Sequence, residues 1–202
     1  MKLIEQSHEI LSITPDLLQQ IELAGRTCYK SEDKITPDSA KKFVRTLIKS
    51  GHHAMIEFGH ITVRCITNRG VSHEIVRHRL CSFAQESTRY VKYDGNMEFI
   101  LPVWFDGQPP GHRQGTFKQF LSLSESTYKT LIAAGWRAEQ AREVLPNALK
   151  TEIVIAANIR EWRHMLQLRT SPKAHPQIRA LFRDILDNFK VQIPVVFEDI
   201  MP

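Results

Sequence analysis

The pattern of apolar and polar positions predicts four strands. Residues 59–67 place Ile61, Val63 and Cys65 at alternate positions, which is typical of a strand with one buried face. Residues 152–157 are rich in β-branched side chains and predict a buried strand. Residues 97–101 favour a short strand, and residues 2–13 a longer one with poorer periodicity.

The same pattern predicts seven helices. Two of them follow Thr14-Pro15-Asp16 and Thr36-Pro37-Asp38, where a hydroxyl can cap a helix whose first turn holds a proline. The first is expected to run to about Cys28, and Gly51 is expected to end the second. Apolar periodicity predicts the other helices over residues 71–79, 116–134, 137–145, 158–168 and 176–199. Pro194 should kink or stop the last helix.

Strands and helices do not alternate as regular βαβ units, so the sequence predicts an α+β fold. The 202 residues are expected to form a single domain, residues 1–202, with a sizeable core. Gly107, Pro109, Pro110 and Gly111 predict a loop over residues 105–115. Lys and Arg number 27 and Asp and Glu 22, and this net charge of +5 is compatible with anionic ligands without selecting one.

The cysteines and the N-terminal segment bear on the cellular compartment of the protein. The three cysteines form no Cys-x-x-Cys pair, so we expect reduced thiols in a cytoplasmic protein. Polar residues interrupt the N-terminal segment too early for a signal peptide. No apolar run approaches the roughly 20 residues that span a bilayer, so no membrane partner is expected.

The candidate chemistry lies in residues 73–90. Arg77-His78-Arg79 is followed by Ser87 and then by Arg89. Arginine is rarely buried without a partner, and its planar group suits phosphate and planar oxygen acceptors. The stretch therefore predicts a site for an anionic ligand, with a nucleotide favoured. The alternative is a solvated basic helix end followed by a loop.

Arg77-His78-Arg79, seven further residues and Ser87 resemble the signature of the flavin-dependent thymidylate synthases. Other segments resemble that family in the same order: Gly51-His52 with Glu57, residues 139–146, and Asn158-Ile159-Arg160 followed by Leu168-Arg169. The resemblance implies a thymidylate-synthase-complementing type of α+β fold and a homotetramer. It also implies methylation of dUMP to dTMP with 5,10-methylenetetrahydrofolate as carbon donor, FAD as cofactor and NADPH as reductant.

The chain has no Gly-x-Gly-x-x-Gly turn, which argues against a Rossmann-type flavin site. The resemblance implies instead that FAD lies at an interface of the homotetramer, where arginines would meet its pyrophosphate. The implied cofactor residues are His52, Ala54, Glu57, Arg77, His78, Arg79, Gln85, Asn158, Ile159, Arg160 and His164. The alternative for His164 is an ordinary surface histidine.

The resemblance also implies a dUMP site, to which a neighbouring subunit contributes the segment from Glu74 to Arg77. The implied substrate residues are Glu74, Ile75, Val76, Arg77, Gln85, Glu86, Ser87, Thr88, Arg89, Arg142 and Arg169. Ser87 and nearby amides would hold the 5′-phosphate. Arg169 is the implied catalytic residue, because a fixed cation beside the pyrimidine stabilises negative charge developing there. The alternative for Arg142 is a surface ion pair with Glu139.

Neither Cys81 nor Ser87 is expected to act as a nucleophile. No base is spaced along the sequence to activate Cys81, and a free cysteine is commonly just buried. Ser87 would need an adjacent general base. We therefore expect polarised uracil to react without an enzyme adduct, with the flavin carrying the redox chemistry.

Four positions depart from the family's usual pattern. The family usually has Gln where Glu74 stands, Glu where Gln85 stands, and Thr or Ser at the place of Ala54. His164 takes a place more often occupied by Asn, which keeps a donor there. Arg77, three residues after Glu74, is expected to pair with that carboxylate.

Parts of the sequence also raise two other functions, a metal-dependent hydrolase and a nucleic-acid-binding module. His52, His53, Glu57 and His60 cluster as in a metal-dependent hydrolase, and on a helix the last three would share a face. However, His-Glu-x-x-His is absent and Gly59 interrupts the segment, so we expect no metal. A nucleic-acid-binding module would carry a larger basic excess and interleaved aromatic residues, so no nucleic acid partner is expected.

Because Cys81 is not expected to attack the substrate, Cys81→Ala should stay active. The measurement is dTMP formation from dUMP by the purified variant. Complete inactivation with the fold and the bound flavin intact would instead indicate that the Cys81 thiol attacks the substrate.

Overall fold

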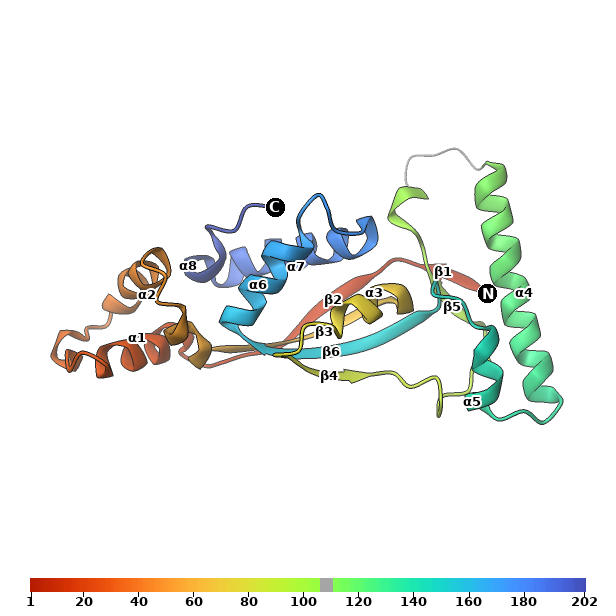
Figure 1. Ribbon diagram of the computed structural model, residues 1–202, viewed down its shortest axis with the longest axis horizontal. Coiled ribbons are helices and arrows are strands. Elements are labelled where there is room, and N and C mark those ends of the chain that lie inside the picture. The colour runs from red at the N-terminus through yellow and green to blue at the C-terminus, as the bar shows by residue number, and fades with distance from the viewer. Residues whose placement is uncertain (106–110) are drawn as a thin grey trace. The chain divides into compact units, whose positions relative to one another are not determined.

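The computed structural model describes residues 1–105 and 111–202, and its elements are labelled in Figure 1. The strands are β1 (Lys2–Ile4), β2 (Ser7–Ile13), β3 (His60–Asn68), β4 (Ser82–Gln85), β5 (Glu98–Ile100) and β6 (Lys150–Asn158). The α-helices are α1 (Leu17–Thr27), α2 (Ser39–Lys49), α3 (Arg69–Ile75), α4 (His112–Ala133), α5 (Ala138–Ala141), α6 (Ile159–Arg169), α7 (Pro176–Gln192) and α8 (Pro194–Phe197). Short 3-10 helices are η1 (Glu32–Lys34), η2 (His53–Phe58), η3 (Val103–Phe105) and η4 (Arg142–Val144). The predicted α+β class is confirmed.

The strands form two sheets. The larger has the order β2-β3-β6-β4, and the smaller pairs β1 with β5 in parallel, with Leu3 opposite Phe99. Along β3 the alternate residues Ile61, Val63 and Cys65 are fully buried, so the predicted alternation is confirmed. β6 has the same alternation, with buried Ile153 and Ile155.

The chain divides into two compact units, each assembled from three segments. The first unit comprises Met1–Ser7, Cys65–Arg77 and Ala84–Ile153, and the second comprises His8–Arg64, His78–Phe83 and Val154–Pro202. The family-signature stretch therefore contributes to both units. No helix of the described residues is long and apolar enough to cross a membrane.

The core of the first unit forms where α4 meets β5. Leu121 and Tyr128 of α4 are fully buried with Phe99 and Met97. Phe120 of the same helix is 53% exposed. α4 therefore carries apolar side chains on its outer face as well as on its core face.

The core of the second unit anchors α6. The buried indole of Trp162 donates a hydrogen bond to the Ile61 carbonyl oxygen at 2.9 Å, and its ring lies 5.2 Å from that of Phe189 on α7. The buried guanidinium of Arg163 pairs with both carboxylate oxygens of Asp199 at 2.7 Å. These contacts fix the rotation of α6, and so determine which of its side chains face outward.

Several predicted boundaries were wrong. The strand predicted over residues 2–13 is two strands, in different sheets. Thr14 does not cap α1, because its hydroxyl accepts from the His60 amide and donates to the His60 carbonyl oxygen. α1 instead follows Asp16, whose φ is 48°. Gly51 does end α2, with a φ of 72°.

The helix predicted over residues 71–79 runs from Arg69 to Ile75. His78 therefore lies outside this helix. The predicted helix over 137–145 is α5 followed by η4. In the predicted loop over 105–115, α4 already begins at His112, and residues 106–110 lie outside the described residues. Pro194 stops α7 and opens α8, as predicted in part.

Candidate active site

A cavity of about 600 Å³ lies in the second unit, alongside the N-terminal half of α6. Its volume falls within the range of small-molecule sites. Residues of η2, of α6 and the exposed Leu80 form its walls. The lining residues are His53, Ile56, Glu57, Leu80, Asn158, Arg160, Glu161, Arg163, His164 and Gln167.

The polar wall of this cavity follows from how α6 begins. The side-chain oxygen of Asn158 accepts from the Glu161 amide at 2.9 Å, so Asn158 is the N-cap. From that start, Arg160 and His164 lie four residues apart on one face. Arg160 donates to Glu57 of η2 at 2.6 Å, and both side chains are about half exposed. The cavity thus offers a cation, an imidazole and amide groups to a ligand.

His78 and Arg169 meet beside this wall. The Arg169 Nε donates a hydrogen bond to His78 Nε2 at 3.0 Å. On the other side of the imidazole, His78 Nδ1 lies 3.4 Å from a carboxylate oxygen of Glu161. His78 and Glu161 are both buried, and the rings of His78 and His164 are 5.9 Å apart.

The surroundings keep His78 neutral. Burial and the neighbouring charge of Arg169 lower the pKa of His78 to about 4, with His164 contributing in the same direction. Burial raises the pKa of Glu161, opposed by His164. Since Arg169 can only donate, Nε2 of neutral His78 is the acceptor and Nδ1 carries the proton. Nδ1 is the ring nitrogen that lies 3.4 Å from the Glu161 carboxylate.

His78, Glu161 and His164 have the spacing of a metal site, with ligand atoms within 4.8 Å of one another. The hydrogen bond from Arg169 argues against that use, because it leaves His78 Nδ1 protonated and places a fixed cation beside the group. The predicted alternative of His53, Glu57 and His60 on one helix face is wrong. η2 ends at Phe58, and His60 lies in β3.

Cys81 is held as a thiol. Its Sγ lies 3.6 Å from the Met165 sulfur, and it is partly buried. Burial and the negative charge of Glu161 raise its pKa to about 12. A thiol with that pKa is a poor nucleophile at neutral pH.

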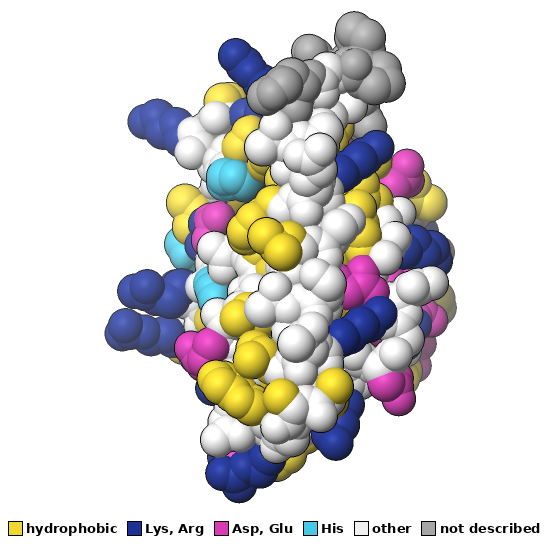
Figure 2. Space-filling model, turned by 90° about the vertical axis from the view of Figure 1, so that its right-hand side faces the viewer, with side chains coloured by type: hydrophobic (Ala, Val, Ile, Leu, Met, Phe, Trp, Pro, Cys, Tyr) yellow, Lys and Arg dark blue, Asp and Glu magenta, His cyan; other side chains and the backbone are white. Residues whose placement is uncertain are grey.

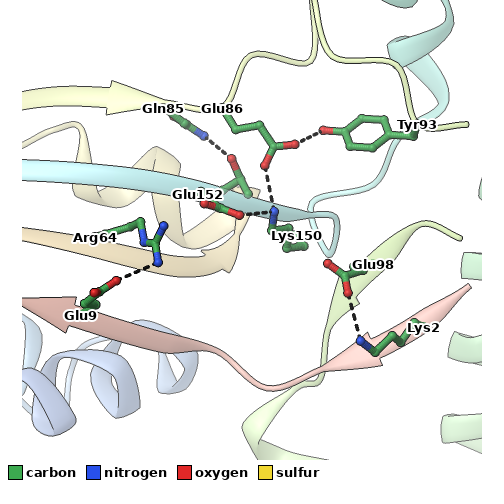
Figure 3. Close-up of polar contacts among 10 residues, drawn as sticks. Lys2, Glu9, Arg64, Gln85, Glu86, Tyr93, Glu98, Lys150 and Glu152 are labelled. Atoms are coloured by element: carbon green, nitrogen blue, oxygen red, sulfur yellow. Dashed lines mark hydrogen bonds and ion pairs between the residues drawn. The ribbon is translucent and has the colours of Figure 1, made fainter. Parts of the chain in front are cut away.

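β4 leads into the predicted substrate segment that begins at Gln85. The side chains of Gln85 and Glu86 are paired with neighbouring residues (Figure 3). The Gln85 amide donates to Ser72 at 2.8 Å and to Thr151 at 3.2 Å. Glu86 accepts from the Tyr93 hydroxyl at 2.8 Å and from Lys150 at 3.2 Å. The Glu86 amide also donates to the Glu152 carbonyl oxygen.

The turn after β4 presents Ser87 and Arg89. The Ser87 hydroxyl accepts from the Arg89 amide at 3.3 Å, which leaves its own proton free to donate. Arg89 donates to Glu139 at 2.9 Å. Arg142 does not form the ion pair with Glu139 considered from the sequence; its Nε lies 3.7 Å from Glu143.

The two predicted residue sets fall largely in different units. All the predicted cofactor residues except Arg77 and Gln85 belong to the second unit, and all the substrate residues except Arg169 belong to the first. Glu57, Asn158, Arg160 and His164 line the cavity described above. The structure brings those four together, and their role in binding a cofactor stays a prediction.

Other predicted residues lie elsewhere or are covered. His52 and Ala54 line a second, smaller cavity of about 240 Å³, with Cys28. The side chains of Ile75 and Ile159 are fully buried, so only their backbone atoms are available to a ligand. Arg77 and Arg79 are exposed.

The sequence reasoning missed three polar features. Glu161 and Lys150 carry no motif signal, although the i, i+3 spacing of Glu161 and His164 could have drawn attention to the first. Arg69 was also missed: its Nη1 is buried without a hydrogen-bond partner among the described residues. A buried guanidinium nitrogen normally has a protein, water or ligand acceptor.

Comparison with known proteins decides the family. The family described as Thymidylate synthase complementing protein matches residues 9–195. This chain belongs to that family. A flavin-dependent thymidylate synthase from Corynebacterium efficiens is 35% identical over 196 residues, 89% of this chain and 78% of that protein. One from Geobacter sulfurreducens is 32% identical over 200 residues, covering 96% and 86% of the two chains.

A solved structure shares the fold. It is described as a UMP/dUMP methylase, PolB, from Streptomyces cacaoi, bound with 5-Br dUMP. Its TM-score to this chain is 0.82 with 23% identity, covering 98% of this chain and 96% of that one. At this identity the similarity bears on the fold alone.

The Lys150 contacts lead to a stability prediction. Lys150 joins the carboxylates of Glu86 and Glu152, at 3.2 and 2.6 Å, and its side chain is only 16% exposed. Lys150→Met should lower the free energy of unfolding by about 2 kcal/mol, because it leaves two partly buried carboxylates without their cation. Chemical denaturation measures the change.

Lys2→Met is the matched control. Its ion pair with Glu98 is exposed on both sides, 65% and 37%, so the change should stay below about 1 kcal/mol. Equal losses in the two variants would contradict the structural role given to Lys150.

Proposed function

We propose that this chain methylates dUMP to dTMP, with 5,10-methylenetetrahydrofolate as carbon donor and with FAD reduced by NADPH. The observation that carries the proposal is the Arg169–His78 pair, set beside a cavity in a chain that belongs to this family. It joins the histidine of the Arg77-His78-Arg79 motif to the arginine that ends α6. NADPH and the folate rest on the family alone.

The residues of the α6 cavity fit a flavin nucleotide. Arg160 supplies a half-exposed guanidinium for phosphate, and the exposed His164 and Gln167 supply further polar groups. Glu57 and Asn158 complete the polar wall. FAD bound by these residues supplies the redox chemistry that side chains lack. The contact of His78 with FAD stays a prediction, because His78 is buried and is not among the residues that line the cavity.

The turn after β4 fits a nucleotide phosphate. Ser87 keeps a hydroxyl proton to donate, and Arg89 and Arg142 are cations on the surface of the same unit. Glu86 contributes no donor there, because its carboxylate and its amide are both engaged. A pyrimidine nucleotide is also supported by the shared fold with a methylase bound with 5-Br dUMP. Because that protein is described as a UMP/dUMP methylase, UMP belongs beside dUMP in the assay.

Arg169 would polarise the pyrimidine. The hydrogen bond from its Nε to His78 fixes the orientation of the guanidinium. A cation fixed in place before the reaction stabilises developing negative charge without reorganisation. The high pKa of the Cys81 thiol supports a reaction without a thiolate adduct. The Ser87 hydroxyl accepts a hydrogen bond from a backbone amide, and that amide is not a base that could activate it as a nucleophile.

The proposal includes a homotetramer with sites shared between subunits. The division of the predicted cofactor and substrate residues between two units is compatible with such sharing. Figure 2 looks onto α4, where hydrophobic side chains gather on the surface. Phe120 and Leu123 there are 53% and 63% exposed, and exposed apolar side chains in a group favour a protein interface. The cytoplasmic location stays a prediction.

Arg169→Ala tests the proposed role directly. The variant should keep FAD, because the α6 cavity residues are unchanged, and should lose dTMP formation by about 100-fold or more, as expected when a fixed charge is removed. Flavin absorbance and product formation from dUMP are measured on the same preparation. Arg45→Ala, which removes an exposed arginine paired with Glu198, serves as the control and should leave both unchanged. Full activity of Arg169→Ala would remove Arg169 from the mechanism.

A further inference from the structure

Glu161 is a buried carboxylate to which the proposed reaction assigns no role. It is 6% exposed and lies in the first turn of α6, three residues before His164. Burying a carboxylate is unfavourable unless a partner compensates it. The partner recorded here is the imidazole of His78, with Nδ1 at 3.4 Å from the carboxylate oxygen.

The order of hydrogen-bond donors and acceptors from Arg169 through His78 to Glu161 is fixed at the Arg169 end. The Arg169 guanidinium can only donate, so His78 must accept at Nε2. A neutral imidazole that accepts at Nε2 carries its proton on Nδ1. Glu161 is then the acceptor that this proton needs. With Glu161 absent, the ring loses the contact that favours this tautomer and this orientation.

We propose that Glu161 is a positioning residue that orients Arg169 through the ring of His78. The inference rests on the proposed function, because it assumes that Arg169 acts on the substrate. Its consequence is a three-residue line, Glu161–His78–Arg169, in which the family motif supplies the middle member and α6 supplies both ends.

The other groups around His78 do not replace Glu161. His164 is exposed and meets His78 ring edge to ring face, at 5.9 Å between centroids. Cys81 is a thiol directed at the sulfur of Met165. Arg169 is a donor. Among the described groups around the ring, Glu161 is the one whose carboxylate lies next to Nδ1, at 3.4 Å.

Two substitutions separate the contact between the Glu161 carboxylate and His78 Nδ1 from mere space filling. Glu161→Gln keeps an oxygen that accepts from His78 Nδ1, and its kcat should stay within about threefold of wild type. Glu161→Ala removes the acceptor, and its kcat should fall by about 10- to 100-fold, the range expected from a small misplacement of a catalytic group. The dissociation constant for dUMP should change little in either variant, and because Glu161 lines the cavity proposed for FAD, flavin occupancy is measured so that kcat refers to flavin-loaded protein. Glu9→Ala, which removes an exposed carboxylate paired with Arg64, is the control and should have wild-type kcat.

The tautomer provides a readout that does not depend on activity. Solid-state ¹⁵N NMR of protein labelled in histidine should find His78 protonated on Nδ1 in wild type and Glu161→Gln, with His78→Gln used only to assign the signal. A proton on Nε2 in wild type would overturn the proposal. So would an unchanged kcat in Glu161→Ala, or equal losses in Glu161→Ala and Glu161→Gln.

The proposed function and the positioning role of Glu161 would be contradicted by different results. If wild-type protein forms no dTMP, the proposed function is wrong, while the NMR measurement still tests the tautomer. If wild type is active and His78 carries its proton on Nε2, the positioning role is wrong and the proposed function stands. If Glu161→Ala does not fold, Glu161→Gln and the wild-type tautomer decide.

Discussion

The anchoring of α6 is the constraint on which the candidate site depends. One side of this helix is held by the hydrogen bond from Trp162 to Ile61 and by the paired oxygens of Asp199 on Arg163. Because the buried side is fixed, Arg160 and His164 face the cavity, and Arg169 is delivered at the last turn. A helix that could rotate would present none of these groups at a defined position.

The polar groups in the two units are arranged for different tasks. Around His78 the charges leave a neutral imidazole between a cation and a carboxylate, an arrangement that orients donors. Around Glu86, Lys150 satisfies two carboxylates and Tyr93 donates a further hydrogen bond, an arrangement that stabilises the start of the predicted substrate segment. Satisfied networks of this kind make a segment rigid. We propose a flavin site in the unit that holds the first arrangement and a nucleotide turn in the unit that holds the second.

The elements with strong periodicity could be predicted from the sequence. β3 was predictable from alternation, β6 from its β-branched residues, α6 from apolar periodicity and the stop at Pro194 from proline geometry. Boundaries set by tertiary contacts could not be predicted. Thr14 looks like a helix cap but bonds to the neighbouring strand at His60. α3 ends before His78 although the polar pattern continues.

The candidate site was predictable only where residues carry a family motif. Arg160, His164 and Arg169 are predicted from the resemblance, and in the structure His164 and Arg169 both lie next to His78. Glu161, Lys150 and Arg69 were missed, because a lone charged residue in a helix or strand reads as surface until its burial is known. Burial is a property of the folded chain, and no local pattern reports it.

The central proposal is that this protein binds both FAD and dUMP. The most direct test is an absorption spectrum of the purified protein, recorded before and after addition of FAD and again with dUMP. The account predicts an oxidised-flavin spectrum that dUMP perturbs. A colourless protein that does not take up FAD would contradict it.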